Sequence, residues 1–525
     1  MTRTKGTPGR LRPYVLGAVS GLVAAFAGLA LAELVAVAVR PEASPVTAVG
    51  GAVVDRTPAA LKEWAIRQFA TADKLVLTLG IVILLAAVAM AAGVLAVRHR
   101  SAGIALAAAF GVAGAAAAVS RPEATWKDAL PSLAGGLAAA VVLYLLVTAL
   151  PRPGPVAGAE GMDRRRFGRL ALAAVALSAG AGYAGRRLGA FGSAGATASR
   201  AGLVLPAPAA PAPPVPAGAD LRIPGLSPFV TPNGDFYRVD TALVVPRVDA
   251  DSWRLLIHGD GVDAPLTLGL RELLARPLVE HDITLTCVSN EVGGPYAGNA
   301  RWLGVRLADL LREAGVRPPS QGGPADQLVA RSVDGMTLGT PVETVLDGRE
   351  ALLAVGMNGG PLPFEHGFPV RMVVPGLYGY VSACKWLREL RLTTFDAYDA
   401  YWVRRSWAPR APVKTQSRID TPRSGAELTA GRVAVAGVAW AQHRGISRVE
   451  VRVDAGRWRE ARLAEADGND TWRQWVWQWE AAPGRHVLEV RATDGTGAVQ
   501  TGERAATLPD GATGWHAVSV SVSGR

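Results

Sequence analysis

Residues 281–294, with the sequence HDITLTCVSNEVGG, decide how the second half of this chain is expected to fold. The β-branched and apolar run His281–Val288 predicts a buried strand, and Cys287 lies at its end. The loop that follows contains the pair Gly293–Gly294. A thiol at a strand end beside a glycine-rich loop is well placed to bind a soft metal. By itself, the pattern is explained equally well by an inert buried cysteine.

Strand and helix patterns of similar length surround this segment. Alternation and short apolar runs predict strands at Trp253–His258, Ala351–Val355 and Val370–Val374. Helical spacing before a Pro or Gly stop predicts helices at Leu268–Leu274 and Leu307–Ala314. Together these patterns predict an α+β domain over residues 221–412.

The C-terminal residues 413–525 have a different pattern. Alternating strands separated by turn residues are expected at Arg432–Trp440, Ile446–Val453 and His486–Ala492. Trp475, Trp477 and Trp479 are two residues apart, so their rings share one face of a strand. The pattern predicts a β-sandwich, in which packing of these rings into the core is favoured over a ligand-binding face.

Composition limits the class of the whole protein. The chain has 525 residues, of which 50% are hydrophobic, and its mean hydropathy is +0.21. That much apolar sequence excludes a disordered protein and indicates that part of the chain lies in lipid, while 2 cysteines exclude a disulfide scaffold. The net charge of +11 comes largely from scattered Arg, and we expect no nucleic-acid partner.

The apolar residues are concentrated in residues 1–190, which we expect to form an all-α membrane anchor. Five spans are predicted at Tyr14–Val39, Leu75–Val97, Ala102–Ser120, Ala129–Leu150 and Leu170–Tyr183, the last being short. Trp64 and Trp126 fall near span ends, and Glu33 is close enough to one end to snorkel. Basic residues at 3–12, 98–100 and 164–169 place those segments in the cytoplasm, so residues after 190 are expected outside it.

The segment before the fifth span, DRRRFGRL at 163–170, resembles a twin-arginine export signal. The alternative is a simple positive-inside anchor. The twin-arginine pathway exports folded proteins, which suits a domain that takes up its cofactor in the cytoplasm. Residues 191–220 are expected to be a linker, because Pro206–Gly218 is rich in Ala and Pro and has little to bury.

No haem site is expected in this chain. No histidine falls inside a predicted span, and the sequence has no Cys-x-x-Cys-His motif. The membrane part is therefore interpreted as an anchor that does not conduct electrons.

Four stretches, in the same order, resemble the sulfite oxidase family of molybdopterin-dependent oxidoreductases. They are TLTCVSNEVGG (284–294), NARWLGVRLADLLREAGV (299–316), MNGGPLPFEHGFPVRMVVPGLYGYVSACKWLREL (357–390) and GVAWAQHRGISRVEVRVDAGRW (437–458). The first three match the family's molybdopterin domain, here 221–412, and the last matches its C-terminal immunoglobulin-like domain, here 413–525. The resemblance implies a molybdenum–molybdopterin cofactor.

The resemblance also implies roles for individual residues. Cys287 would provide the thiolate that binds molybdenum. The resemblance implies that a further set of residues binds the cofactor: His366, Arg371, Lys385, Ser382, Asp334, Tyr237 and Arg238. Asp334 is explained nearly as well as part of an Asp-Gly hairpin turn. Pyranopterin phosphate is a dianion, which a protein binds with Arg, Lys and His.

The chain departs from the family around the substrate. Val355 stands where sulfite oxidases have a catalytic Tyr, and Glu291 and Val292 stand where they have basic residues. The remaining substrate-pocket candidates are Arg444, from the C-terminal domain, together with Arg301, Trp302 and His443, the last for proton transfer. The second cysteine, Cys384, is expected to pack near the cofactor without binding the metal.

We therefore expect an oxidoreductase that carries out oxo transfer on a small molecule at the outer face of the cell membrane. Two electrons per turnover require an external carrier, either a cytochrome or the membrane quinone system. A homodimer formed through the C-terminal domain is a further expectation from the resemblance. The alternative is a non-catalytic extracytoplasmic binding module that has kept the fold and lost the chemistry.

Overall fold

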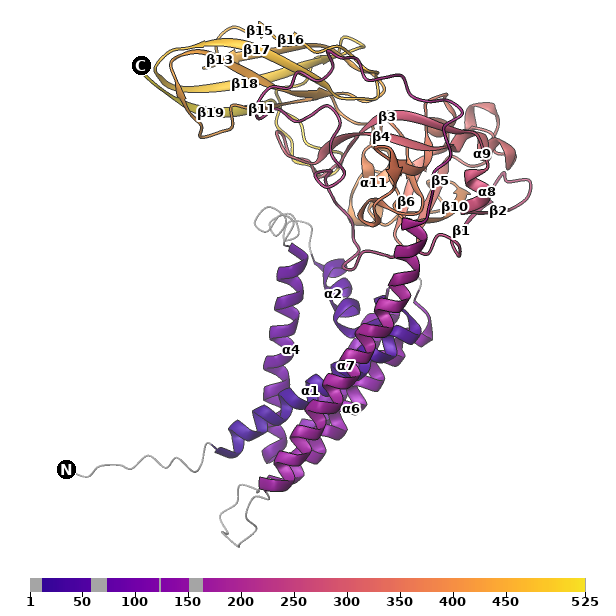
Figure 1. The fold of residues 1–525 in the computed structure, drawn as a ribbon, viewed down its shortest axis with the longest axis vertical. Helices are drawn as coiled ribbons and strands as arrows, with labels where there is room; N and C mark the ends of the chain where they lie inside the picture. Colours follow the sequence, from indigo (N-terminus) through magenta and orange to yellow (C-terminus); the bar gives the residue numbers. More distant parts are fainter. Residues whose placement is uncertain (1–11, 58–72, 122–123, 151–163, 525) are drawn as a thin grey trace, which may run out of the picture. The chain divides into compact units, whose positions relative to one another are not determined.

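The computed structural model describes residues 12–57, 73–121, 124–150 and 164–524 (Figure 1). The chain divides into two compact units. Unit 1 comprises Met1–Gly195 and Thr241–Val245, and unit 2 comprises Ala196–Asp240 and Pro246–Arg525. Each unit is described separately below.

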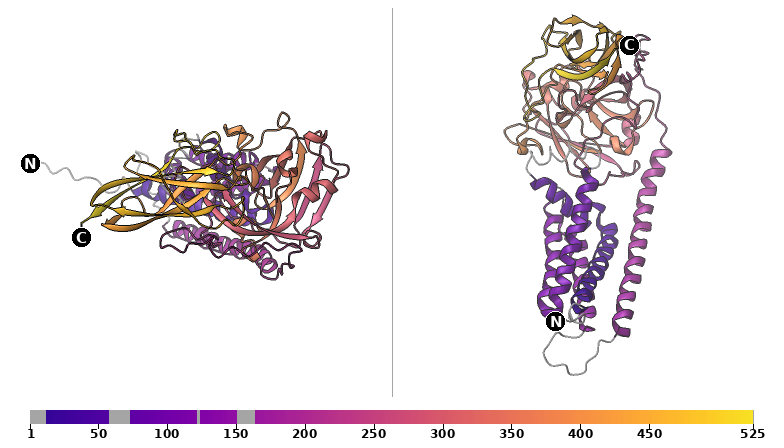
Figure 2. Two further views of the ribbon diagram at one scale, coloured as in Figure 1. Left: turned by 90° about the horizontal axis from the view of Figure 1, so that it is seen from above. Right: turned by 90° about the vertical axis from the view of Figure 1, so that its left-hand side faces the viewer.

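The described part of unit 1 is built from helices. They are α1 (Arg12–Val39), η1 (Pro41–Ala43), α2 (Pro45–Arg56), α4 (Asp73–Arg98), α5 (Arg100–Val119), η3 (Trp126–Ala129), α6 (Leu130–Thr148) and α7 (Arg164–Ala201). Helix α1 packs against α4 and α6, and α5 packs against the same two helices. The right-hand view of Figure 2 shows α7, in magenta, running beside this bundle. Only 6% of the most apolar 18-residue stretch of α7 is buried.

Glycine allows these helices to approach closely. A Cβ atom on Gly21 of α1 would lie 1.9 Å from the carbonyl oxygen of Ala89 in α4. A Cβ atom on Gly28 would lie 2.6 Å from the carbonyl oxygen of Gly135 in α6. Backbones that pack at this distance leave no room for larger residues, as is typical of apolar helices held together by van der Waals contact.

Two polar contacts join the ends of these helices. Arg40 donates to the buried Asp128 over 2.6 Å, and this pairing offsets the cost of burying the carboxylate. Ser44 donates a hydrogen bond to Glu33, so this carboxylate has a neighbour near the end of α1.

Five helices are long and apolar enough to cross a membrane, judged by length and composition alone: Pro13–Val39, Val76–Arg98, Arg100–Val119, Trp126–Thr148 and Arg165–Ala201. They overlap the five predicted spans, and the fifth helix is longer than predicted. Trp126 is 72% exposed at the start of the fourth, as expected of an interfacial indole. Trp64 and the basic residues at 3–10 lie outside the described residues.

The prediction of a short fifth span was wrong. Helix α7 has 38 residues, and it continues through 191–201, which were expected to begin the linker. The sequence from Ala184 to Ala201 contains no proline and is rich in Ala, so nothing ends the helix before Gly202.

None of the residues 206–218 is buried, as expected of a spacer, but the segment also pairs with a strand, which the sequence did not predict. Ala209 donates to the carbonyl of Leu278 over 2.8 Å, and Glu280 donates to the carbonyl of Ala210 over 2.9 Å. The segment thus pairs in parallel with the edge strand that begins at Leu278. Ala209 and Ala210 are adjacent residues between prolines, so the extended chain can use backbone groups there that proline would block.

Two mixed α/β layers form the first part of unit 2. One sheet has the order β3-β4-β7-β8, with β9 also paired to β7. Its strands are β3 (Leu278–Thr286), β4 (Ala297–Arg306), β7 (Leu352–Met357), β8 (Gly360–Pro361) and β9 (Arg371–Val373). The predicted strand ending at Cys287 is confirmed, since β3 is buried along most of its length.

The second sheet has the order β2-β1-β10-β5-β6, and β1 pairs in parallel with β10. Its strands are β1 (Arg254–Gly259), β2 (Leu266–Gly269), β5 (Gln327–Ser332), β6 (Thr337–Pro341) and β10 (Leu387–Thr393). Short helices connect the strands: α8 (Leu270–Leu274), α9 (Leu307–Glu313), α10 (Val342–Leu346), α11 (Gly379–Ser382), and 3-10 turns η4 (Pro319–Gln321), η5 (Phe364–His366) and η6 (Val403–Arg405). The predicted helices at 268–274 and 307–314 correspond to α8 and α9.

The C-terminal part of unit 2 consists of two sheets that share one apolar core, drawn in yellow and orange in Figure 1. The first has the order β11 (Gln416–Thr421), β13 (Gly431–Trp440), β17 (Arg473–Ala481), β16 (Arg462–Leu463). The second has the order β12 (Glu427–Thr429), β19 (His516–Ser523), β18 (Gly484–Asp494), β14 (Ile446–Val453), β15 (Arg459–Glu460). Trp475 and Trp479 lie in the shared core and Trp477 packs against it, which confirms that these rings are core residues. The immunoglobulin-like assignment stays a prediction.

Candidate active site

Cys287 lies directly after β3, where the chain enters the loop with Gly293 and Gly294. Its backbone N–H donates to the carbonyl of Tyr296 over 3.0 Å, so the loop is closed across its base. The thiol is 8% exposed and lies 3.0 Å from the hydroxyl of Ser289. Burial raises the pKa of the thiol, and the ammonium of nearby Lys385 partly opposes this.

Arg371 is the most deeply buried cation of this region, with 4% exposure. It begins β9, where its guanidinium carbon lies 4.9 Å from the ring of Trp302 and one N–H donates to the carbonyl of His366 over 3.1 Å. Burial lowers the pKa of Arg371 to about 10. Its Nε has no hydrogen-bond partner, and no carboxylate pairs with it among the residues that the structure describes. A buried, under-satisfied guanidinium of this kind is suited to an anion.

His366 and Lys385 lie close to Arg371. The Nε2 of His366 is 2.9 Å from the carbonyl oxygen of Asn233, so the ring donates from that nitrogen. Burial lowers the pKa of His366 to about 4, and the charges of Arg371 and Lys385 add to this effect, so the ring is neutral at pH 7. The predicted role of His366 is therefore that of a neutral hydrogen-bonding group.

Lys385 forms the outer part of the same group. Its Nζ donates to Asp240 over 3.0 Å and to the carbonyl of Glu365 over 3.1 Å. Burial lowers the pKa of Lys385 to about 8, and Asp240 partly opposes this. Asp240 also accepts from Arg238 over 2.9 Å, so the predicted residue Arg238 reaches the group only through this shared carboxylate.

Aromatic rings fill the space between these polar groups. The ring of Phe236 contacts those of Tyr237, His366 and Trp302, with centroids 5.2, 5.5 and 5.9 Å away. Burial raises the pKa of Tyr237, with a further contribution from Cys287, while Arg371 opposes it. Tyr237 is thus electrostatically linked to both the thiol and the guanidinium.

Of the neighbouring residues Arg301 and Trp302, only Trp302 belongs to this group. Successive residues of β4 face opposite sides of the sheet, so the two side chains cannot share one pocket. Trp302 is fully buried beneath Arg371, whereas Arg301 forms a two-pronged ion pair with Asp282 and donates to the carbonyl of Pro213.

The two candidates from the C-terminal sheets have other partners. Arg444 pairs with Asp494 over 2.9 Å and donates to the carbonyl of Val413. His443 lies 3.1 Å from Asp470, which is also 3.0 Å from His281, so the carboxylate bridges two imidazoles. That cluster is built on different residues from those around Cys287.

Ser382 and Asp334 are held by local structure. Fully buried Ser382 donates to the carbonyls of Leu377 and Tyr378 within the turn of α11. Asp334 lies in the β5–β6 hairpin and accepts from the hydroxyl of Ser332, as the hairpin-turn alternative predicted. Burial raises the pKa of Cys384, and the structure describes it as a free buried cysteine.

Several residues of the group were not anticipated from the sequence. Tyr378 is 3% exposed, burial raises its pKa to about 12, and Cys287 contributes to the shift. Asn233 and Asp240 orient His366 and Lys385, and Tyr296 closes the loop after Cys287. Tyr378 and Asp240 take part through their side chains, whereas Asn233 and Tyr296 act through backbone carbonyls, which no sequence pattern encodes.

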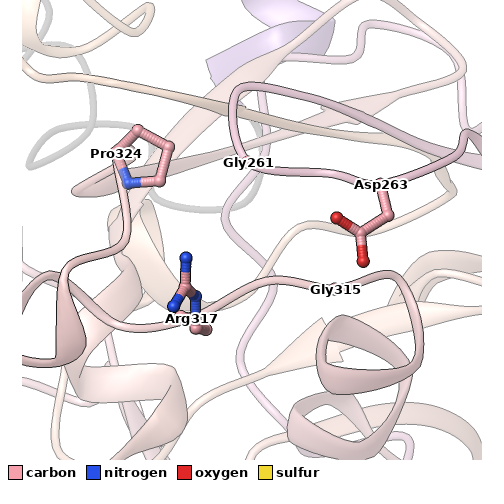
Figure 3. Close-up of a pocket in the computed structure, with 5 residues that line it drawn as sticks. All are labelled: Gly261, Asp263, Gly315, Arg317 and Pro324. Carbon is pink, nitrogen blue, oxygen red and sulfur yellow. The ribbon is translucent and has the colours of Figure 1, made fainter.

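A surface hollow lies elsewhere in unit 2. It has a volume of about 490 Å³ and is lined by Gly261, Asp263, Gly315, Arg317 and Pro324 (Figure 3). None of these residues belongs to the group around Cys287, and the exposed loops that form the hollow contain no buried polar side chain. We assign it no role.

Comparison with known proteins agrees with the geometry. Residues 242–402 match the family model described as the oxidoreductase molybdopterin binding domain. The chain is 32% identical over 293 residues to the mitochondrial sulfite oxidase of Rattus norvegicus, and the match covers 48% of this chain and 52% of that protein. It is 34% identical over 294 residues to the sulfite oxidase of Gallus gallus, and this match covers 48% of this chain and 62% of that protein. It is also 34% identical over 162 residues to the uncharacterized oxidoreductase YuiH of Bacillus subtilis, covering 31% of this chain and 75% of YuiH. Among solved structures, the sulfane dehydrogenase SoxCD of Paracoccus pantotrophus matches with 26% identity and a TM-score of 0.45, covering 52% of this chain and 74% of that one.

The family model and the sequence relatives define the class as molybdopterin-binding oxidoreductases. The chain belongs to the family of the oxidoreductase molybdopterin binding domain, within which its curated relatives include the sulfite oxidases. It spans about half the length of the mammalian sulfite oxidases that it matches. Membership implies a molybdenum–molybdopterin cofactor, and the residues present fit one: they include a buried free thiol at a strand end and a buried arginine with an unsatisfied N–H, both of which act electrostatically on Tyr237.

Proposed function

We propose that this protein is a membrane-anchored, molybdenum-cofactor-dependent oxidoreductase that carries out oxo transfer on a small substrate at the outer face of the membrane. The observation that carries the proposal is the buried group of Arg371, Lys385 and His366, together with the buried thiol of Cys287, whose pKa the nearby ammonium of Lys385 lowers. When bound, the cofactor supplies two-electron redox chemistry. The protein supplies the thiolate, the anion-binding charges and the exclusion of water.

The proposed roles follow from the side chains. Cys287 would bind the metal once its proton is lost, and Lys385 favours that loss. Arg371 and Lys385 would bind the phosphate and other anionic edges, while neutral His366 would donate a hydrogen bond. Tyr237 and Tyr378 would face the metal side with neutral phenols, since burial raises the pKa of both.

The resemblance implies a substrate side poorer in positive charge than in sulfite oxidases, because the loop after Cys287 carries Glu291 and Val292 where they have basic residues. Val355 is buried and lacks the hydroxyl of their catalytic Tyr. We therefore propose oxo transfer without committing to sulfite. Electrons would be exchanged with an external carrier, either a cytochrome or the membrane quinone system. Twin-arginine export of the folded domain and a homodimer through an immunoglobulin-like C-terminal domain belong to the same proposal.

The test is the molybdenum content of the purified protein and its Cys287→Ser variant. We expect the unmodified chain to bind one molybdenum-containing cofactor with visible absorption, and Cys287→Ser to lose it. Cys384→Ser is the matched control, because this second buried thiol is expected to have no role in binding the metal. Full molybdenum in Cys287→Ser would contradict the assignment, and an unmodified chain without cofactor absorption would favour the binding-module alternative.

A further inference from the structure

The last turn of α7 contacts the loop that leads to His366. The Nε of Arg200 donates to the carbonyl of Leu362 over 2.7 Å, and its second terminal nitrogen donates to the carbonyl of Pro361 over 2.9 Å. Arg200 and its two acceptors belong to the same compact unit. One guanidinium therefore holds two consecutive carbonyls of a loop more than 160 residues away in the sequence.

A second arginine strengthens this contact. The ring of Phe364 is 9% exposed and lies 5.9 Å from the guanidinium carbon of Arg200 and 5.1 Å from that of Arg247. Arg247 in turn donates to the hydroxyl of Thr197 over 3.2 Å, and Ala250 donates to the hydroxyl of Ser199. The last turn of α7, the segment 247–250 and the loop around Phe364 thus form one packed group.

The same loop also accepts hydrogen bonds from Arg371 and Lys385 of the candidate active site and from the adjacent Trp386. Trp386 donates to the carbonyl of Phe364 over 2.8 Å, Lys385 donates to that of Glu365, and Arg371 donates to that of His366. The carbonyl of Pro363 accepts from the backbone N–H of His366. Every carbonyl from Pro361 to His366 is therefore occupied, with Arg200 at one end and the cofactor-binding candidates at the other.

We propose that Arg200 is a positioning residue for the cofactor loop, so that the last turn of α7 supports the site as well as continuing the anchor helix. Arg200 acts through Pro361 and Leu362 on the segment that carries His366 and accepts hydrogen bonds from Lys385 and Arg371. The inference rests on the proposed function for the identity of the ligand.

The chemistry requires arginine at this position. Its planar fork donates to two adjacent carbonyls while its face covers an aromatic ring. Lysine would keep the charge and one hydrogen bond but would lose the second bond and the stacked geometry. Arg200→Lys should therefore loosen the loop without removing the positive charge.

The experiment compares hydrogen exchange and molybdenum content in the full-length chain and its Arg200→Lys and Arg200→Ala variants. Arg473 provides the matched control, because it also donates to two backbone carbonyls, those of Ala464 and Ile446, but within the C-terminal sheets. We expect exchange in residues 360–368 to become about tenfold faster in Arg200→Lys, and faster still in Arg200→Ala, as two bonds to a charged donor are weakened. We also expect molybdenum to be lost more rapidly on dialysis and the Mo(V) resonance signal to broaden. The Arg473→Lys variant should change exchange only near its own partners.

The outcomes separate the inference from the proposed function. Unchanged exchange in residues 360–368 of both Arg200 variants would overturn the positioning role, as would the same change in Arg473→Lys. An unmodified chain that binds no molybdenum would refute the proposed function, and the exchange comparison alone would then decide whether Arg200 orders the loop.

Discussion

At the scale of single residues, a carboxylate pair outside the cofactor group gives a clear pH dependence. Burial raises the pKa of Asp467 to about 6, and the neighbouring Asp282 contributes to the shift. The folded state therefore binds the proton of Asp467 more tightly than the unfolded state does. As the pH rises from about 4 to about 6, Asp467 becomes ionised in the folded protein, and the free energy of unfolding falls.

We therefore expect Asp467→Asn to stabilise the protein at pH 8, by about 1 kcal/mol after allowance for partial exposure, and to have little effect at pH 4. Urea denaturation of both proteins across this range measures the difference. Asp470→Asn is a control that should change stability in the opposite direction. Burial would raise the pKa of Asp470, but its hydrogen bonds with His281 and His443 hold that pKa at about 2. Removal of the Asp470 carboxylate should therefore lower the free energy of unfolding at neutral pH. A stabilisation by Asp467→Asn that is equal at pH 4 and pH 8 would contradict this account.

The loop after Cys287 depends on one glycine. Gly293 has a φ of +80°, and a Cβ atom there would lie 2.1 Å from the ring of His516. Burial lowers the pKa of His516 to about 4, so this ring is neutral at pH 7. Gly293→Ala combines backbone strain with a clash against a neutral, packed ring, and we expect it to lower the free energy of unfolding by about 2–3 kcal/mol.

Gly497→Ala isolates the backbone contribution, since Gly497 has a φ of +89° and no atom near the added Cβ. Thermal denaturation should show a smaller loss there, of about 1 kcal/mol. The double variant Gly293→Ala with His516→Ala tests the clash directly. If Gly293→Ala and Gly497→Ala cost the same, the contact with His516 does not constrain the loop.

The sequence predicted the residues of the candidate site better than their partners. Cys287, Arg371, His366 and Lys385 are brought together because each lies at the end of a strand or in a connecting loop that the apolar pattern already predicted. Arg301 and Trp302 are neighbouring residues of a strand and face opposite ways, so they cannot both line one pocket, which the motif alone does not reveal. Asn233 acts through its backbone carbonyl, and no side-chain pattern encodes that contact.

At the scale of elements, β17 shows how period-two tryptophans divide their roles. Trp475 is fully buried in the core between the two C-terminal sheets, whereas Trp477 is partly exposed beside it. We expect Trp475→Ala to destabilise by about 3–5 kcal/mol and Trp477→Ala by clearly less, since the cost follows the apolar volume removed from the core. Denaturant unfolding followed by fluorescence measures both, and equal losses would show that the two rings are equally buried in solution.

The ends of elements were the least predictable part of the fold. Helix α7 runs past 190 because alanine-rich sequence without proline continues a helix whether or not it lies in lipid, so hydropathy alone ended it too early. The Pro-rich segment pairs with β3 because an exposed strand edge attracts any extended chain with free backbone groups. The first difference could have been predicted from helix propensity, whereas the second depends on a contact with β3 that local sequence patterns do not contain.

At the scale of the whole molecule, the number of spans predicts the side on which each loop lies. Five spans beginning in the cytoplasm would place His99 inside and Ala124 and Val204 outside. All three positions are described and accessible to some degree, and Val204 is 85% exposed. The native thiols of Cys287 and Cys384 are 8% and 2% exposed, so they should give little background with a thiol reagent.

We therefore expect a membrane-impermeant maleimide to label Ala124→Cys and Val204→Cys in intact cells, and to label His99→Cys only after permeabilisation. The unmodified chain measures the background from the two buried thiols. Labelling of His99→Cys but not Val204→Cys in intact cells would reverse the orientation and put the candidate active site in the cytoplasm. Labelling of all three would mean that α5 does not cross the membrane, because α5 is the candidate span between His99 and Ala124, and two loops on the same side are separated by an even number of crossings.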